Sequence, residues 1–121
     1  RAIKLPVSAP FHCELIKKAS IEMRKEISNY LFNPFSVPLY SNVTAKVCND
    51  REIAELLINQ IISKVRWREI IENMLSDGVT NFIEIGPGNV LTNLVKRASK
   101  DIVAISISKL EDLNKLDNIE L

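Results

Sequence analysis

The one histidine of this 121-residue chain, His12, is the side chain best suited to proton transfer. It lies in the segment Leu5-Pro-Val-Ser-Ala-Pro-Phe-His-Cys-Glu-Leu15, where a predicted strand ends and a predicted helix begins. Strand ends in α/β proteins are where pockets form, and an imidazole there can act as a general base near neutral pH. A lone histidine at such a junction also serves as a surface or helix-capping residue. Without further context, that structural interpretation is preferred.

Two cysteines offer a second kind of chemistry. Cys13 adjoins His12, which suggests a Cys–His dyad, but neighbouring residues at the start of a helix point in different directions. A partly buried, inert thiol is therefore the preferred interpretation of Cys13, and Cys48 has no basic neighbour. Two thiols in a chain of this size do not form a disulfide framework, so a reducing cytoplasm is the expected compartment.

Other motifs for catalysis or binding are weak or missing from the sequence. One histidine and two distant cysteines give no metal-ligand spacing, so no metal or cofactor is expected. The Gly86-Pro87-Gly88 turn could hold an anion at a helix N-terminus, although a tight structural turn is preferred. No serine is flanked by glycines, so the chain has no Gly-x-Ser-x-Gly nucleophile elbow. A histidine base would need its nucleophile from outside these residues.

The composition is that of a globular domain. Hydrophobic residues make up 46% and charged residues 26%, and the formal net charge is +1. No basic cluster indicates nucleic-acid binding, and no apolar run is long enough for a membrane helix. The mixed charges of residues 24–26, and of Arg66, Arg68 and Glu69, are interpreted as solvated helix faces. The chain begins with Arg1 and not Met, which is expected of a processed, trimmed or split product.

The first part of the chain predicts short strands between helices. Strands are expected at residues 1–8 and 37–43, an amphipathic helix at 13–31, and two further helices at about 50–63 and 66–76. Asp77-Gly78 is expected to end the last of these helices. The apolar positions of the 13–31 helix are Leu15, Ala19, Met23, Ile27 and Tyr30 or Leu31; the residues expected to face inward on the next two helices are Ile53, Leu56, Leu57, Gln60 or Ile61, Ile70, Ile71, Met74 and Leu75.

The last third of the chain predicts a strand–helix–strand unit. Strands are expected at 81–85 and 101–107, with the glycine turn and a helix from Val90 to Ala98 between them, followed by a short helix from Ser108. A connection of this kind predicts two parallel, buried strands. The fold class is therefore α/β.

Four ordered segments resemble bacterial malonyl-CoA:acyl carrier protein transacylases. The segment around His12 is similar to the family's histidine motif, and Val37-Pro-Leu-Tyr-Ser-Asn-Val43 to the strand after its long helix. Gln60-Ile-Ile-Ser-Lys-Val-Arg-Trp67 resembles the segment that carries a glutamine near the active site. Phe82-Ile-Glu-Ile-Gly-Pro-Gly-Asn-Val-Leu-Thr92 looks like the strand, turn and helix near the C-terminus. The resemblance covers nearly the whole chain up to about Ser108.

The resemblance implies that His12 is the general base and that the main-chain carbonyl of Gln60 orients its imidazole. It implies the C-terminal part of an α/β-hydrolase-like acyltransferase subdomain over residues 10–121. Residues 1–9 would be the last strand of a small ferredoxin-like insertion. The implied substrates are malonyl-CoA and the phosphopantetheine thiol of acyl carrier protein, in fatty acid biosynthesis. The nucleophile serine would come from an N-terminal half outside this chain.

Three functional hypotheses follow from the sequence. The first is a portion of the transacylase that is inactive alone and active only with the N-terminal half. The second is a split or decayed gene product that acts at most as an interaction module, with self-association through uncovered apolar surface. The third is part of a polyketide synthase acyltransferase domain. The chain departs from the family at Ser63-Lys64, where Asn-Pro is common, and at Asn89, where Lys is usual.

Overall fold

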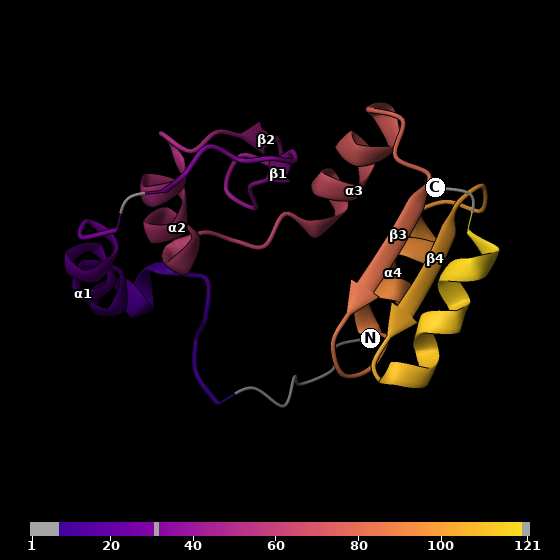
Figure 1. Cartoon of the computed structure of the whole chain (residues 1–121). Helices are drawn as coiled ribbons and strands as arrows, with labels where there is room; N and C mark the ends of the chain where they lie inside the picture. The colour runs from indigo at the N-terminus through magenta and orange to yellow at the C-terminus, as the bar shows by residue number, and fades with distance from the viewer. Residues whose placement is uncertain (1–7, 31, 120–121) are drawn as a thin grey trace. The chain divides into compact units, whose positions relative to one another are not determined.

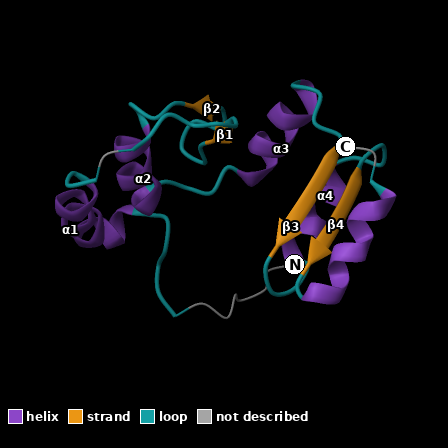
Figure 2. Ribbon diagram, in the orientation of Figure 1, coloured by secondary structure: helices purple, strands orange, loops and turns teal. Residues whose placement is uncertain are grey.

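The computed structural model describes residues 8–30 and 32–119. The chain is mixed α/β and divides into two compact units, Arg1–Ile70 and Ile71–Leu121. Figures 1 and 2 show the elements within each unit. The strand predicted over residues 1–8 lies almost wholly outside the described residues. The predicted subdomains, residues 1–9 and 10–121, stay predictions, because residues 1–7 lie outside the described part of the chain.

The first unit contains two packed helices and a small hairpin. The 3₁₀ helix η1 (Glu14–Ile16) leads into α1 (Lys17–Ile27), and α1 packs against α2 (Ile53–Ile62). Between the two helices in the sequence come β1 (Leu39–Tyr40) and β2 (Val47–Cys48), which pair antiparallel with Leu39 opposite Cys48. The turn of this hairpin contains Ala45, which is fully buried and has a positive φ of 59°.

The prediction of a long amphipathic helix over residues 13–31 was wrong in two respects. The α-helix ends at Ile27, and its predicted apolar face is open within this chain: the exposed fraction is 80% for Leu15 and 43% for Met23. The residue that α1 buries is Ser20, whose hydroxyl donates to the Ile58 carbonyl at 3.2 Å. The contact with α2 therefore includes a small polar side chain, whereas Leu15 and Met23 stay exposed.

The hairpin and α2 also differ in detail from the prediction. Only Leu39–Tyr40 of the predicted 37–43 strand is extended, and its partner β2 was not predicted. On α2 the buried residues are Ile53 and Ile58, whereas Leu57, predicted to face inward, is 40% exposed. The helix α2 begins at Ile53, later than the predicted start at about residue 50; Asn49 Oδ1 accepts hydrogen bonds from the amides of residues 51 and 52 in the turn just before it.

The helix α3 (Trp67–Ser76) runs across the boundary between the units and buries Ile70 and Ile71, as predicted. It ends where Gly78 adopts a left-handed φ of 87°. The amide of Gly78 donates to Leu75, and the amide of Val79 donates to Met74. This is the glycine helix stop that the sequence indicated.

The second unit is a parallel strand–helix–strand unit, as predicted. It consists of β3 (Asn81–Ile85), α4 (Val90–Ala98), β4 (Val103–Ile107) and the 3₁₀ helix η2 (Leu110–Asn118). The two strands are parallel with Ile83 opposite Ile105, and α4 packs against both of them. The prediction that both strands are buried was wrong, because Ile85 is 82% exposed and Val103 43% exposed. Within the described residues of the second unit, α4 covers one face of this two-stranded sheet and leaves the other face exposed.

Candidate active site

The loop that carries His12 is short and held by its own backbone. The amide of Phe11 donates to the Ala9 carbonyl at 3.0 Å, and the amide of Ile16 donates to the Cys13 carbonyl at 3.2 Å. Between these two turns His12 has a φ of 60°, in the left-handed region that side chains other than glycine rarely adopt. Such a conformation costs on the order of 1–3 kcal/mol, and residues of this kind cluster at functional sites.

The imidazole of His12 meets the end of α2. Its Nδ1 lies 3.2 Å from the main-chain carbonyl oxygen of Gln60. A carbonyl oxygen only accepts hydrogen bonds, so Nδ1 carries the proton and the lone pair of the neutral ring is on Nε2. The side chain of His12 is exposed, and no hydrogen bond to Nε2 is present within residues 8–30 and 32–119. The arrangement leaves Nε2 available to take a proton.

The Gln60 carbonyl is available because it lies in the last turn of α2. The last carbonyls of a helix have no partner in the helix and carry the negative end of its dipole. Here the Gln60 oxygen also accepts from the amide of Ser63 at 3.3 Å. The helix end therefore presents a fixed partial negative charge to the imidazole. It does so without burying a charged carboxylate beside the ring.

Two side-chain contacts hold α1 against α2 and thereby position the His12 loop that precedes α1. One is the buried hydrogen bond from Ser20 to the Ile58 carbonyl. The other is a bidentate ion pair in which Arg24 Nη1 and Nη2 donate to Glu55 at 2.5 and 2.9 Å. This pairing lowers the pKa of Glu55. Because both charged side chains are about half exposed, the ion pair fixes geometry more than it adds stability.

The structure does not join Cys13 to His12. The Cys13 thiol donates to the Pro10 carbonyl at 3.1 Å, so its hydrogen bond goes to the backbone of its own loop. Cys48 is a buried free thiol in the hairpin, and burial together with the nearby charge of Glu52 raises its pKa. A thiol of raised pKa stays protonated and unreactive at neutral pH. Both cysteines therefore fit the structural interpretation.

The Gly86-Pro87-Gly88 turn leads into α4, and two of the N-terminal amides of α4 already bind a carboxylate of the preceding strand. The carboxylate of Glu84 accepts from the amides of Leu91 and Thr92 at 3.1 and 2.8 Å and from the Thr92 hydroxyl at 2.7 Å. These hydrogen bonds, the Thr92 hydroxyl first, lower the pKa of Glu84. A fixed negative charge at this position opposes a bound anion. The structure thus supports the structural interpretation of this turn.

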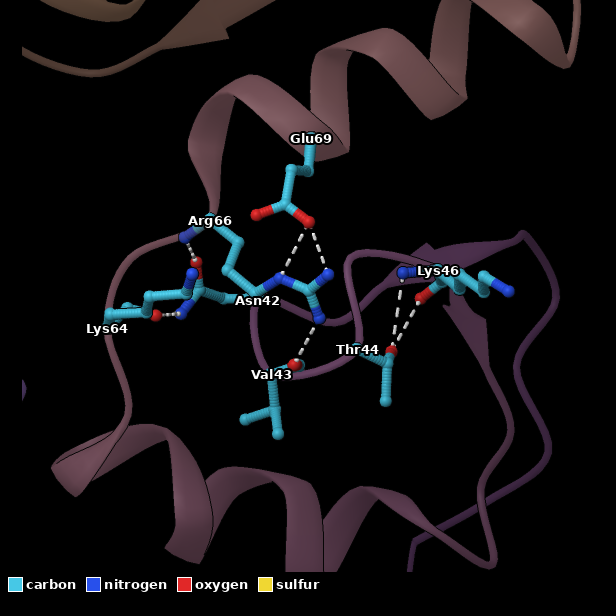
Figure 3. A network of polar contacts seen from close by, with 7 residues as sticks. All are labelled: Asn42, Val43, Thr44, Lys46, Lys64, Arg66 and Glu69. Atoms are coloured by element: carbon cyan, nitrogen blue, oxygen red, sulfur yellow. Dashed lines mark hydrogen bonds and ion pairs between the residues drawn. The ribbon is translucent and has the colours of Figure 1, made fainter.

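The sequence interpretation missed a polar cluster beside the hairpin, drawn in Figure 3. Arg66 and Glu69 were interpreted as part of a solvated helix face, but the Arg66 side chain is only 29% exposed. Its guanidinium donates to the Val43 carbonyl at 2.9 Å as well as to Glu69. Asn42 in the hairpin turn joins the same cluster. The only sequence signal was Asn42 itself, inside the predicted strand 37–43. A single asparagine there does not indicate which residues it binds.

An α/β chain whose histidine is oriented through Nδ1 by a main-chain carbonyl is equipped for general-base chemistry. Within the described residues no group of metal-ligating side chains occurs, and no helix there is both long and apolar enough to cross a membrane. No protein-family model matches the chain. Curated relatives and solved structures do match it.

The malonyl CoA-acyl carrier protein transacylase of Bacillus subtilis strain 168 is 42% identical over 114 residues, which is 93% of this chain and 36% of that protein. The crystal structure of the transacylase of the same name from Clostridium perfringens superposes with a TM-score of 0.91 at 38% identity, over 98% of this chain and 38% of that one. A malonyl-transacylase in complex with its type II polyketide synthase acyl-carrier protein has a TM-score of 0.88 at 33% identity, over 95% of this chain and 38% of that one.

The chain therefore belongs to the malonyl-CoA:acyl carrier protein transacylase family and matches the C-terminal portion of its members. It spans a little over a third of the length of the curated relatives it matches, 36% of the Bacillus subtilis protein. The resemblance recognised in the sequence is confirmed at the level of the family. The roles of His12 and Gln60 stay predictions, since a shared family does not test a residue.

Proposed function

We propose that this chain supplies the general base of malonyl transfer from coenzyme A to acyl carrier protein, with His12 as the base. The observation that supports the proposal is the 3.2 Å contact between His12 Nδ1 and the Gln60 carbonyl oxygen. That contact orients the ring, sets its tautomer and directs the basic Nε2 away from α2. Gln60 acts through its main chain, so its role is to position the imidazole and not to react.

In the proposed reaction a serine from outside these residues is the nucleophile. The serine hydroxyl gives its proton to His12 Nε2 as its oxygen attacks the malonyl thioester. The carbon–sulfur bond breaks, the coenzyme A thiolate leaves with the proton from Nε2, and a malonyl-serine ester remains. The phosphopantetheine thiol of acyl carrier protein then gives its proton to Nε2 and attacks the ester; the ester C–O bond breaks, and the serine oxygen takes the proton back from Nε2. Because the thioester is already activated, the proposed reaction needs no cofactor.

Acyl carrier protein is the proposed partner. The structural relative that is complexed with an acyl-carrier protein supports it, since that malonyl-transacylase is similar to nearly the whole of this chain. We further propose that residues 10–121 belong to the large acyltransferase subdomain and residues 1–9 to the ferredoxin-like insertion, in a cytoplasmic enzyme of fatty acid biosynthesis. Residues 1–7 are outside the described part of the chain.

The chain alone is proposed to be inactive. It contains no Gly-x-Ser-x-Gly segment, and a base without its nucleophile cannot form the serine ester. The competing hypothesis, a non-catalytic interaction module, would leave His12 without a catalytic effect in any assembly. The polyketide synthase hypothesis would keep the same base and differ in the carrier protein that receives the malonyl group.

The test is a chimera in which this chain replaces the corresponding C-terminal portion of the Bacillus subtilis relative. Malonyl transfer from radiolabelled malonyl-CoA to carrier protein is measured for the chimera, for the chain alone and for two variants. We expect transfer by the chimera and none by the chain alone. His12→Ala should lower acyl-enzyme formation by roughly 10²–10⁴, the usual contribution of a general base.

Cys13→Ala is the matched control, because it changes the adjacent residue of the same loop and removes the thiol of the alternative dyad. Its rate should stay near that of the unchanged chimera. If the chimera with His12→Ala transfers the malonyl group as fast as the unchanged chimera, His12 is not the base. If the chain alone transfers malonate, the proposal of an external serine is wrong.

A further inference from the structure

The side chain of Asn42 holds the segment that follows α2, as Figure 3 shows. Its amide nitrogen donates to the Lys64 carbonyl at 3.0 Å, and its oxygen accepts from the Arg66 amide at 2.7 Å. One carboxamide thus binds a carbonyl and an amide two residues apart, as a residue in a neighbouring strand does. Residues bound in this way are kept extended.

The Arg66 side chain strengthens the same connection. Its guanidinium donates to the Val43 carbonyl at 2.9 Å and, through Nε, to Glu69 at 3.0 Å. The hydrogen bond to Glu69 raises the pKa of Arg66 and lowers that of Glu69, so both side chains stay charged at neutral pH. The hairpin turn and the segment 64–66 are therefore joined by three hydrogen bonds, each between a side chain and the main chain.

This connection matters because nothing in the local sequence stops α2. Residues 51–77 contain neither glycine nor proline, the two residues that usually end a helix. If α2 continued by one turn, the Lys64 amide would donate to the Gln60 carbonyl, since an α-helix pairs each amide with the carbonyl four residues earlier. The Gln60 oxygen would then be occupied by its own helix and lost to His12.

In the structure α2 ends before that bond can form. Its last residue is Ile62, and Ser63 is extended, with φ −94° and ψ 144°. Lys64, whose carbonyl is bound by Asn42, makes no amide hydrogen bond within the described residues. The Gln60 oxygen keeps only the long 3.3 Å contact with the Ser63 amide and accepts from His12 Nδ1.

We propose that Asn42 is a positioning residue for the candidate active site: by holding Lys64 and Arg66 extended, its carboxamide ends α2 at Ile62 and leaves the Gln60 carbonyl free to orient His12. The functional meaning of this inference rests on the proposed role of His12 as the base. The structural part does not depend on that role, because the state of the imidazole can be measured without any reaction.

The test uses the single histidine of the chain, whose ring nitrogens can be observed by ¹⁵N NMR without ambiguity. In the unchanged chain the neutral ring should be mainly the Nδ1–H tautomer. In Asn42→Ala the fraction of neutral rings that carry the proton on Nδ1 should fall to that of a histidine in an unstructured peptide. The carbon chemical shifts of residues 63 and 64 should become helical. Asn93→Ala is the matched control, since within the described residues the one hydrogen bond of the Asn93 side chain is to the exposed Asn89, just before α4.

A second variant separates this mechanism from general loss of structure. Lys64→Pro removes the amide that would take the Gln60 carbonyl, and the ψ of 144° at Ser63 suits a residue before proline. Adding Lys64→Pro to Asn42→Ala should restore the Nδ1–H tautomer. The proposal is wrong if Asn42→Ala keeps that tautomer, or if the double variant does not regain it. A failure of His12→Ala to slow malonyl transfer would instead overturn the proposed function and leave the tautomer result standing.

Discussion

Two helix ends in this chain offer backbone groups to a side chain, and they differ in what the side chain has left over. At the end of α2 the Gln60 carbonyl binds one nitrogen of His12, and the other nitrogen stays available. At the start of α4 the amides of Leu91 and Thr92 bind both oxygens of Glu84, which the Thr92 hydroxyl also contacts. A capped helix end can serve chemistry only when the capping group keeps a reactive atom, and of the two only the imidazole does.

The comparison also separates main-chain from side-chain contributions. At α2 the helix supplies a main-chain carbonyl, so the identity of residue 60 matters little to the bond. At α4 the bond depends on the carboxylate of residue 84. The largest effect on folding is therefore expected in the second unit, from Glu84→Gln. This change removes the charge and one acceptor oxygen, leaving an N-terminal amide of α4 without its partner.

We expect Glu84→Gln to lower the free energy of unfolding of the second unit and to speed hydrogen exchange in α4. Amide NMR of residues 71–119 measures the effect, because the single tryptophan, Trp67, lies in the first unit. Glu111→Gln, which changes a highly exposed glutamate of the same unit outside α4, is the control. Unchanged exchange in α4 would mean that Glu84 does not hold this helix end.

Thr92→Val should have the next largest effect. The Thr92 side chain is buried, and its hydroxyl is placed to donate to Glu84 at 2.7 Å or to the Ile105 carbonyl at 3.2 Å. Valine fills a similar volume without a donor. A lost hydrogen bond to a charged group costs about 1.5–3 kcal/mol of stability. Urea unfolding followed by the amide signals of β4 measures it, and Thr80→Val, at an exposed position before β3, should change little.

Lowering the pH should decrease the stability of the second unit through the carboxylate of Asp112. Asp112 accepts from Lys115 and from the amides of Ser108 and Lys109, and these contacts, that of Lys115 first, lower its pKa from 3.8 to about 2. Between these two values the unfolded chain binds more protons than the folded one, so stability falls as the pH is lowered through this window. Hydrogen exchange in η2 at pH 6, 4 and 3 follows the change. In Asp112→Asn this contribution to the pH dependence should be absent.

The sequence predicted best where a local signal decided the structure. The helix α4 occupies the predicted residues, Val90–Ala98, because a glycine turn precedes it and its pattern is short and regular. The family resemblance also brought His12 and Gln60 together, and the structure places Nδ1 at the Gln60 carbonyl. The first prediction needed only residues that are close in sequence. The second needed two segments that occur together in one known family.

The sequence predicted less where distant contacts decided the structure. The apolar repeat of residues 13–31 identified a helix but not the partner of each face, so Ser20 and not Met23 is the residue that α1 buries. The same limit hid Asn42, whose hydrogen bonds go to residues 22 and 24 positions away. The role of an asparagine in a turn cannot be predicted until the residues that it binds are known.

The smallest effect is expected from Gln60→Ala, and it is the sharpest test of the comparison. Alanine keeps the main-chain carbonyl and has a high helix propensity, so α2 should still end beside His12 and hold its Nδ1. Malonyl transfer by the chimera and the ¹⁵N tautomer of His12 should both stay near their unchanged values, in contrast to His12→Ala and Asn42→Ala. A large loss of transfer with an unchanged tautomer would show that the Gln60 side chain itself acts in the reaction. In that case the end of α2, like the start of α4, would depend on a side chain.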